Sequence, residues 1–351
     1  MKKIEKSFTG VFILVEALME NLKNRVTIYQ VSKASGYSIA TVSRVISKKS
    51  NVAEETRLKV EETIKRLGYK PSALAQALAT NKSTNIGVVI PNANYVYIAN
   101  MLNGINEVAN KKGFVLTLFT TAHSRDEALL AIEKVITTHV DGAIIFDDEL
   151  DEEDVAKINS YSVPTIVVNS NVSGERVGSI IFSYRNVLEK TIKNYYEQGG
   201  KREMTFIHVH DSGRLLTKCE KKFVETHKEI GRPYHIINCD DSYTRTYNDF
   251  VEHFKTNKNG YFIAYRDSIA AAIENAATDV GLKVPQDVEV LSLVGTKYAH
   301  IVRPTLSSMQ IDMQEVGKRS MYMLIDLINE SLENKSYKFE AQFVKRNSTE
   351  Y

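Results

Sequence analysis

The sequence predicts a small all-helical head followed by an α/β body of two doubly wound lobes. Near the start of the chain, two short amphipathic stretches are joined by a single glycine, Gly36. Further along, short runs rich in Val and Ile alternate with longer stretches of helical periodicity. That alternation is typical of parallel sheets covered by helices on both faces. A chain of 351 residues has room for two or three such compact units.

The overall composition is that of an ordinary globular protein. The chain has 45 Lys and Arg against 43 Asp and Glu, with 43 % hydrophobic and 25 % charged residues. This balance excludes a histone-like polycation and an acidic-tail protein. No run of about 18 uncharged apolar residues occurs, so we expect no membrane partner. Two cysteines are too few for a disulfide framework or a zinc cage, and a reducing, cytoplasmic location is the simplest interpretation.

The charges are unevenly distributed along the chain. Residues 1–85 contain 15 Lys and Arg but only 7 Asp and Glu, which leaves 30 and 36 for the remainder. A basic head is the electrostatic signature of a partner that carries phosphates, whereas an acidic body is repelled by such a partner. The near-neutral total is therefore an average over two opposite parts.

Residues 1–26 form an N-terminal extension before the first clear pattern. Its apolar stretch, residues 11–18, is interrupted by Glu16 and is followed by no small-residue cleavage site, which argues against a secretory signal. We expect a short helix or a flexible lead.

Residues 27–70 carry the signals of a helix-turn-helix. Thr27 is placed to cap a helix over Ile28–Ser35, and Gly36 ends that helix because glycine adopts a left-handed conformation at little steric cost. Ser38 then caps a second helix over residues 39–47. Two short helices joined by a tight glycine turn are typical of a motif whose second helix fits the major groove of DNA, although a plain helical subdomain gives the same spacing.

A third helix is predicted over Glu54–Leu67. Its apolar residues Leu58, Val60, Ile64 and Leu67 are expected to complete the core of the head.

The strings VTIYQVSKASGYSIATVSRVI, TRLKVEETIKRLGYKPS and ALAQALATNKSTNIGVVIP resemble the start of bacterial transcription regulators of the LacI/GalR family. The resemblance runs from about Val26 almost to the C-terminus. It implies a homodimer that binds a pseudo-palindromic operator on double-stranded DNA and acts as a repressor of carbohydrate or catabolic genes. A later string, TKYAHIVRPTLSSM, resembles the catabolite control protein A branch.

The resemblance also implies which residues touch DNA. Ile39 and Ala40 occupy the first-turn positions that select sequence; being apolar, they suit thymine methyl groups. Arg44 is the long donor of that helix and either takes guanine O6 and N7 or holds a phosphate. Ser38 and Thr41 complete the predicted contacts of the second helix. The positions expected to hydrogen-bond the sugar-phosphate backbone are Thr27, Tyr29, Ser43, Asn51, Thr56 and Tyr69.

Residues 71–84 match the hinge helix and linker of the family. The segment is too short to be a stable helix alone in water, and in the family two such helices pair in the minor groove. Leu78 corresponds to the leucine that wedges the central base step, with a plain exposed linker residue as the alternative. Ser72, Ala75 and Gln76 are the other expected hinge contacts.

Residues 85–350 form the predicted periplasmic-binding-protein-like core. We expect lobe 1 to comprise about residues 85–183 and 309–328, and lobe 2 about residues 184–305 and 329–350. A small ligand would bind in the crevice between the lobes. The expected strands are residues 86–91, 114–120, 141–146, 164–169, 204–210, 234–239, 260–265 and 288–294.

No pattern in the core indicates an enzyme. No glycine-rich phosphate loop, nucleophile elbow or H-E-x-x-H string follows the predicted strands. His208 and His210 share one strand face, which reads as a solvated strand end rather than a metal site. We therefore expect no catalytic activity, no metal and no cofactor.

The expected effector pocket departs from the family pattern. The resemblance places Ser183, Lys218 or the adjacent Cys219, and the pair Gly295–Thr296 at three positions that hold sugar hydroxyls in relatives, and none supplies the expected group. A buried hydroxyl without a partner costs about 1–3 kcal/mol, so the usual sugar mode is not expected. The remaining candidates for a different ligand are Asn94, Tyr95, Tyr97, Asn169 and Asp267.

The regulatory signal is therefore open at this stage. A small molecule, such as a sugar or sugar phosphate, and a protein co-regulator both remain candidates. Tyr322 and Asp326 stand where the catabolite control branch has cations for a phosphoserine protein, so that partner is not expected to dock in the same way. A sensing module of the same fold with weakened operator function is the alternative to a working regulator.

Overall fold

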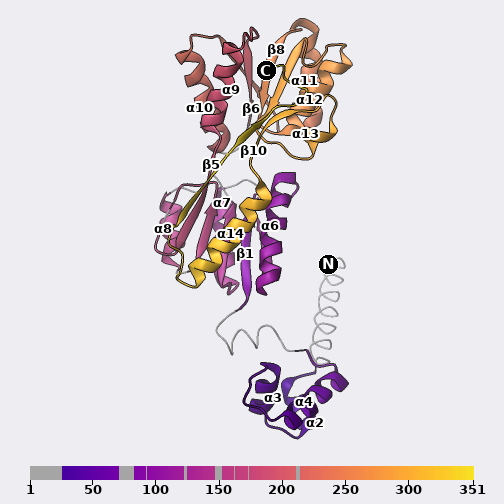
Figure 1. Cartoon of the computed structure of the whole chain (residues 1–351), viewed down its shortest axis with the longest axis vertical. Coiled ribbons are helices and arrows are strands. Elements are labelled where there is room, and N and C mark those ends of the chain that lie inside the picture. The colour runs from indigo at the N-terminus through magenta and orange to yellow at the C-terminus, as the bar shows by residue number, and fades with distance from the viewer. Residues whose placement is uncertain are drawn as a thin grey trace, which may run out of the picture. The chain divides into compact units, whose positions relative to one another are not determined.

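The structure is a computed structural model that describes residues 26–70, 83–91, 93–121, 125–146, 152–161, 163–172, 174–210 and 214–351. The chain divides into two compact units, Met1–Ser83 and Thr84–Tyr351. Figure 1 shows the helices of the first unit and the two α/β lobes of the second. The predicted N-terminal extension and most of the predicted hinge lie outside the described residues.

The head contains the three predicted helices, α2 (Ile28–Ser35), α3 (Ile39–Ile46) and α4 (Glu54–Leu67). Thr27 and Gln30 form a capping box at the start of α2, which satisfies two backbone N–H groups. Gly36 ends α2 with φ of 78°, a conformation that glycine adopts without strain. The core of the head is a cluster of Val31, Val42, Val45 and Val60.

One predicted core residue of the head is not buried. Leu58 is 58 % exposed, whereas Val60 and Thr63 of the same helix face inward. Leu58 and Val60 are two residues apart, which places them on nearly opposite sides of an α-helix. Thr63 takes an inward position because its hydroxyl donates to the backbone oxygen of Lys59 at 2.9 Å.

The core has the predicted two-lobed architecture. Each lobe has a six-stranded, largely parallel sheet, with strand order β11-β5-β4-β3-β1-β2 in lobe 1 and β12-β10-β9-β8-β6-β7 in lobe 2. The elements of lobe 1 are β1 (Asn85–Ile90), α6 (Val96–Lys112), β2 (Val115–Thr120), α7 (Arg125–Thr137), β3 (Gly142–Phe146), α8 (Glu152–Ser160), β4 (Thr165–Val168), β5 (Val177–Ser183), α14 (Met313–Ile328) and β11 (Ser336–Glu340).

Lobe 2 repeats the scheme with helices on both faces of its sheet. Its elements are α9 (Arg185–Glu197), β6 (Met204–Val209), α10 (Arg214–Glu229), β7 (Tyr234–Cys239), α11 (Tyr243–Thr256), β8 (Gly260–Ala264), α12 (Asp267–Asp279), β9 (Val288–Ser292), α13 (Tyr298–Ile301), β10 (Ser307–Gln310) and β12 (Gln342–Val344).

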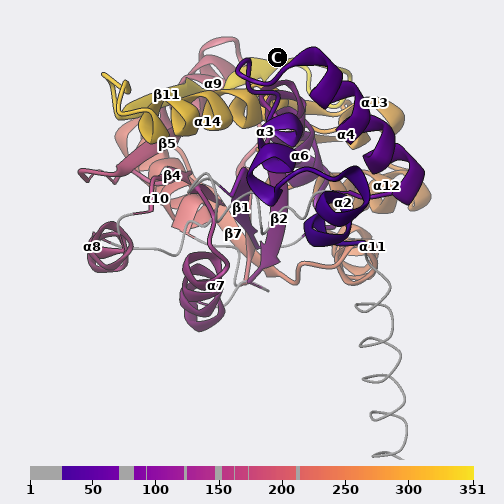
Figure 2. The same ribbon diagram turned by 90° about the horizontal axis from the view of Figure 1, so that it is seen from below.

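Alternate residues of the interior strand β1 face opposite helical layers. Along β1, Val88 packs in the cluster under α6 and α14, and its neighbour Val89 packs in the cluster under α7 and α8. Figure 2 shows α14 on one side of the strands of lobe 1 and α7 and α8 on the other. Both faces of β1 are therefore buried, which explains why its sequence is a nearly continuous apolar run.

The end of the chain crosses between the lobes later than expected. Residues 329–350 were assigned to lobe 2, but β11 pairs in parallel with β5 in the sheet of lobe 1. Only β12, which pairs antiparallel with β10, belongs to lobe 2. The last crossover lies at Ala341, because residues 336–340 are needed to complete the outer edge of the first sheet.

Two glycines bring α6 and α14 into backbone contact. A Cβ atom on Gly104 would lie 2.0 Å from the backbone oxygen of Gln314, and one on Gly317 would lie 2.0 Å from that of Met101. No side chain fits at either position, so the two helices pack at the smallest possible separation. This contact joins the second chain segment of lobe 1 to the first.

Glu274 is a buried acid in the middle of α12. Its side chain is inaccessible to solvent, and neither carboxyl oxygen has a hydrogen-bond partner among the described residues. Burial raises the pKa of this carboxyl from 4.5 to about 8. The folded chain therefore holds a proton that the unfolded chain releases as the pH rises above 4.5.

Glu274→Gln should make the folded protein less sensitive to alkaline conditions. Because the folded-state pKa is raised, the free energy of unfolding of the wild type falls as the pH rises from 4.5 towards 8. Glutamine is neutral throughout, so the stability advantage of the variant should grow with pH over that interval. Calorimetric melting of both proteins across the interval measures it, and parallel profiles would contradict the buried, protonated carboxyl.

Candidate nucleic-acid interface and ligand cleft

The second helix of the head, α3, presents an exposed first turn. Ser38 caps the helix by accepting from the backbone N–H of Thr41 at 3.2 Å. Ile39 is 45 % exposed, and both Ala40 and Arg44 are exposed as well. The exposed face of α3 therefore offers two apolar side chains from its first turn and one long cation, Arg44, from its last turn.

The predicted backbone-contact residues are accessible to different degrees. Tyr29 is 65 % exposed, and Thr27 and Asn51 are exposed, whereas Ser43 and Thr56 are half-buried. The oxygen and the N–H of Thr27 are already engaged by Gln30 within the cap. Tyr69 packs against the valine core of the head, and this burial raises its pKa. The hinge residues Ser72, Ala75, Gln76 and Leu78 lie outside the described residues.

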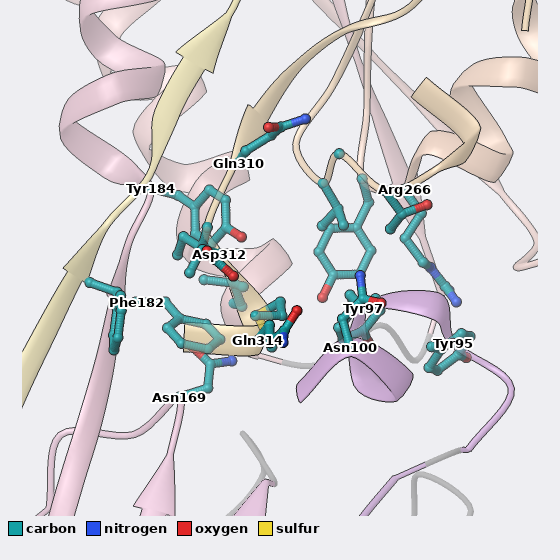
Figure 3. Close-up of a pocket in the computed structure, with 18 of the residues that line it drawn as sticks. Tyr95, Tyr97, Asn100, Asn169, Phe182, Tyr184, Arg266, Gln310, Asp312 and Gln314 are labelled. Carbon is teal, nitrogen blue, oxygen red and sulfur yellow. The ribbon is translucent and has the colours of Figure 1, made fainter. Parts of the chain in front are cut away.

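A cleft of about 720 Å³ lies between the two lobes of the core. Its walls are the C-terminal ends of the strands, where ligands bind in open α/β sheets. Figure 3 shows Phe182 and Asn169 on one side and Tyr95 and Arg266 on the other. The lining residues include Tyr95, Tyr97, Asn100, Phe146, Asn169, Phe182, Tyr184, Tyr265, Arg266, Thr296, Lys297, His300, Gln310, Asp312, Gln314, Phe339, Glu340 and Gln342.

Aromatic rings form a continuous wall on the lobe 1 side of the cleft. Tyr95 and Tyr97 stack with centroids 5.5 Å apart. Phe146 follows 6.2 Å from Tyr97, and Phe182 follows 6.1 Å from Phe146. Such rings offer flat apolar faces to a ligand and hold one another in place. Burial raises the pKa of the Tyr184 hydroxyl beside them, so this group stays protonated.

Five amide side chains contribute neutral polar groups to the cleft. Asn169 follows β4 with a positive φ of 69°, a conformation that asparagine tolerates better than most residues. Its backbone N–H donates to the oxygen of Ile180 at 2.7 Å, which fixes the turn. The other amides of the lining are Asn100, Gln310, Gln314 and Gln342.

Four of the eight predicted effector residues line the cleft, namely Tyr95, Tyr97, Asn169 and Thr296. Asn94 and Lys218 are exposed and are not part of the lining. Ser183 lies at the crossover, where its backbone oxygen accepts from Ala341 at 3.1 Å. Cys219 is buried behind the cleft, which raises the pKa of its thiol to about 12.

Asp267 does not line the cleft and instead holds a neighbouring loop. Its Oδ2 atom accepts from both the backbone N–H and the hydroxyl of Thr296, each at 2.6 Å. Burial raises the pKa of the Asp267 carboxyl, and these hydrogen bonds oppose that rise. Asp267 therefore positions Thr296 and its neighbour Lys297 at the cleft wall.

Some cleft residues were not identified from the sequence, although a signal for them existed. Phe146 is the last residue of the predicted strand 141–146, and Tyr265 the last of the predicted strand 260–265. Residues at the C-terminal ends of parallel strands meet at one edge of a sheet. The glutamines of the late crossovers carried no such signal, because β10 to β12 were not predicted.

The remaining predictions concern metals, membranes and partner docking. The side chain of His208 is paired with an acid rather than only solvated, because its Nδ1 atom lies 2.5 Å from the Oε2 atom of Glu220. Among the described residues, no group of three or more His, Cys, Asp or Glu side chains is placed to hold a metal ion. No helix in that part of the chain is long and apolar enough to cross a bilayer. Tyr322 is 44 % exposed on the outer face of α14.

Comparison with known proteins identifies the head and the core. A family model described as bacterial regulatory proteins, lacI family, matches residues 27–72, and a periplasmic binding protein-like domain matches residues 194–349. The catabolite control protein A of Staphylococcus epidermidis is 30 % identical over 317 residues, covering 88 % of this chain and 94 % of that protein. The chain belongs to the LacI family of bacterial transcriptional regulators.

Other relatives agree with this assignment. The HTH-type transcriptional regulator pepR1 of Lactobacillus delbrueckii subsp. lactis is 30 % identical over 335 residues, covering 93 % of this chain and 98 % of that protein. A lac repressor dimer bound to operator and an anti-inducer superposes with a TM-score of 0.82 at 22 % identity, covering 93 % of this chain and all of that one. As a LacI-family member, the chain is a non-enzymatic, DNA-binding regulator.

Asp267→Ala should destabilise the core, whereas Asp267→Asn should be much milder. Removing the carboxylate leaves the N–H and hydroxyl of Thr296 unsatisfied in a buried place, which costs about 1–3 kcal/mol. Asparagine keeps one oxygen that can accept from Thr296. Denaturant unfolding of the three proteins measures the difference, and equal losses in both variants would show that the negative charge, rather than the acceptor, matters at this position.

Proposed function

We propose that this LacI-family regulator is a repressor that binds a pseudo-palindromic operator as a homodimer and controls carbohydrate or catabolic genes from the cytoplasm. The observation that carries the DNA part is the exposed face of α3, where Ile39 and Ala40 of the first turn are followed by Arg44 of the last turn. A two-fold operator requires two heads, and homodimerisation through the core supplies them.

The charge distribution supports the same function. The 15 cations of residues 1–85 attract phosphates without regard to sequence. The acidic remainder keeps the core away from DNA and so favours contact through the head. Sequence preference must then come from the few side chains that reach base edges, chiefly those of α3.

Arg44→Ala should weaken binding to the specific operator more than binding to random DNA. A bidentate guanine contact contributes about 1–3 kcal/mol of discrimination, or roughly 5- to 150-fold. Arg232, an exposed arginine of lobe 2, provides the matched control, and its replacement by alanine should change neither affinity. Operator sites captured from genomic DNA by purified protein serve as the specific probe in gel shifts over a salt series.

Equal losses on operator and random DNA would assign Arg44 to a phosphate instead. If the wild type shows no sequence preference at any salt concentration, the regulator function itself is refuted. The chain would then be a sensing module that has kept the fold without operator recognition.

We infer that the effector is a small ring-containing molecule bound in the cleft. The aromatic wall from Tyr95 to Phe182 supplies flat faces, and Asn169 and the other amides supply hydrogen bonds without net charge. Among solved relatives, one regulator was determined with lactose and another with cellobiose. The positions that hold sugar hydroxyls in the family differ in this chain, so we propose an atypical binding mode.

A ligand that binds only the folded state raises the melting temperature, and this should hold for an effector of the cleft. A panel of mono- and disaccharides, their phosphates and nucleosides provides the probes. Phe182→Ala and Asn169→Ala should each abolish the shift seen with the wild type. Asn94→Ala should retain it, because Asn94 lies outside the cleft lining.

A shift that survives both cleft variants would place the ligand elsewhere. The second candidate signal is a protein co-regulator, which the exposed Tyr322 on α14 favours. In that case Tyr322→Ala should impair regulation by the partner while leaving every small-molecule response intact.

A further inference from the structure

One contact joins the two lobes at the side of the cleft and has no role in the proposed DNA recognition. Tyr95 comes from lobe 1, immediately before α6. Asp241 and Arg266 come from lobe 2, where Asp241 precedes α11 and Arg266 precedes α12. Figure 3 shows Tyr95 beside Arg266 at the edge of the cleft. These three residues are called the interlobe triad below.

Tyr95 contacts both members of an ion pair on the opposite lobe. Arg266 and Asp241 form a salt bridge through Nη2 and Oδ2. The hydroxyl of Tyr95 donates to the same Oδ2 atom at 2.9 Å. The ring of Tyr95 lies under the guanidinium group, whose central carbon is 4.4 Å from the ring centroid. One side chain thus hydrogen-bonds the anion and stacks on the cation.

The Tyr95 ring covers a guanidinium group that is already almost fully buried, that of Arg266. Its side chain is only 8 % exposed, and its Nε atom has no hydrogen-bond partner among the described residues. A cation removed from water needs compensation, and Asp241 with the Tyr95 ring provides it. If the lobes separated, Tyr95 would withdraw and the ion pair would return to water.

Both sides of the contact are held rigidly within their own lobes. On lobe 2, Arg266 is adjacent to Asp267, which is tied to Thr296 by two hydrogen bonds. On lobe 1, Tyr95 stacks on Tyr97, and the α6 helix that follows is fixed to α14 at Gly104. The contact therefore depends on the angle between the lobes rather than on local flexibility.

We propose that the interlobe triad is a latch that holds the lobes together in the absence of any ligand. Tyr95 and Arg266 also line the cleft, so a molecule entering it meets two of the three latch residues. Binding then changes the latch, and the latch in turn sets how readily the cleft opens. The inference concerns the core alone and does not depend on operator binding.

The test is the distance between spin labels on the two lobes of the full-length protein without ligand. Glu133→Cys on α7 and Glu252→Cys on α11 are exposed label positions, and Cys219 and Cys239 are buried. Labelled chains are diluted with unlabelled ones so that only pairs within one chain are measured. We expect a narrow distance distribution for the doubly labelled protein that carries no further substitution.

Tyr95→Phe removes only the hydroxyl and should shift the distribution or broaden it; Arg266→Gln should do so more strongly. Tyr247→Phe is the matched control, because the Tyr247 hydroxyl donates to the Asp279 carboxylate at 2.6 Å entirely within lobe 2. Identical distributions for the intact protein, Tyr95→Phe and Arg266→Gln would overturn the latch.

A double-mutant cycle tests the contact between Tyr95 and Asp241 without spin labels. Tyr95→Phe, Asp241→Asn and their combination are compared by denaturant unfolding of the full chain. Hydrogen bonds to charged groups lead us to expect coupling of about tenfold in the unfolding equilibrium constant. A coupling factor near one would mean that the contact is not formed in solution, and the proposal would fail.

Discussion

The contact on which the core depends is the backbone approach of α6 to α14 at Gly104 and Gly317. The two helices come from chain segments about two hundred residues apart, yet each also contributes to the cleft lining, with Asn100 from α6 and Gln314 from α14. Because no Cβ fits between them, their relative position is set by backbone rather than by adaptable side chains. The floor of the cleft on the lobe 1 side is consequently stiff, and movement is left to the angle between the lobes.

Periodicity and capping signals were sufficient to predict the head and eight strands of the core, β1 to β4 in lobe 1 and β6 to β9 in lobe 2. Thr27, Gly36 and Ser38 act within a few residues of their own position, so their effect can be read locally. The strands on either side of the interlobe crossovers, β5, β10, β11 and β12, were not predicted. Strand β11 reads SYKFE, which alternates polar and apolar residues but is only five residues long and has no continuous apolar run. It is a strand because β5 offers it a free edge, and that depends on the tertiary fold.

The residues that line the cleft could also be predicted only in part from the sequence. The chemistry of Asp267 made it a reasonable ligand-contact candidate, and only the structure shows that its carboxylate is used by Thr296. Arg266, one residue earlier, lines the cleft, although nothing in the sequence separates the two. Neighbouring residues at a strand-to-helix turn point in different directions. The hydrogen bonds of Asp267 to Thr296 turn its carboxylate away from the cleft, and Arg266 is the residue of the two that lines it.

The late crossover at Ala341 has a consequence for synthesis of the chain. The head has a hydrophobic core of its own, formed within residues 26–70, so it can fold as soon as it leaves the ribosome. Lobe 1 must wait, since α14 and β11 lie within the last forty residues. Until they emerge, the apolar face of α6, including Met101 and Ile105, lacks its cover. A nascent chain thus carries a folded head on an unfinished core, whose uncovered apolar surface favours aggregation until the last residues emerge.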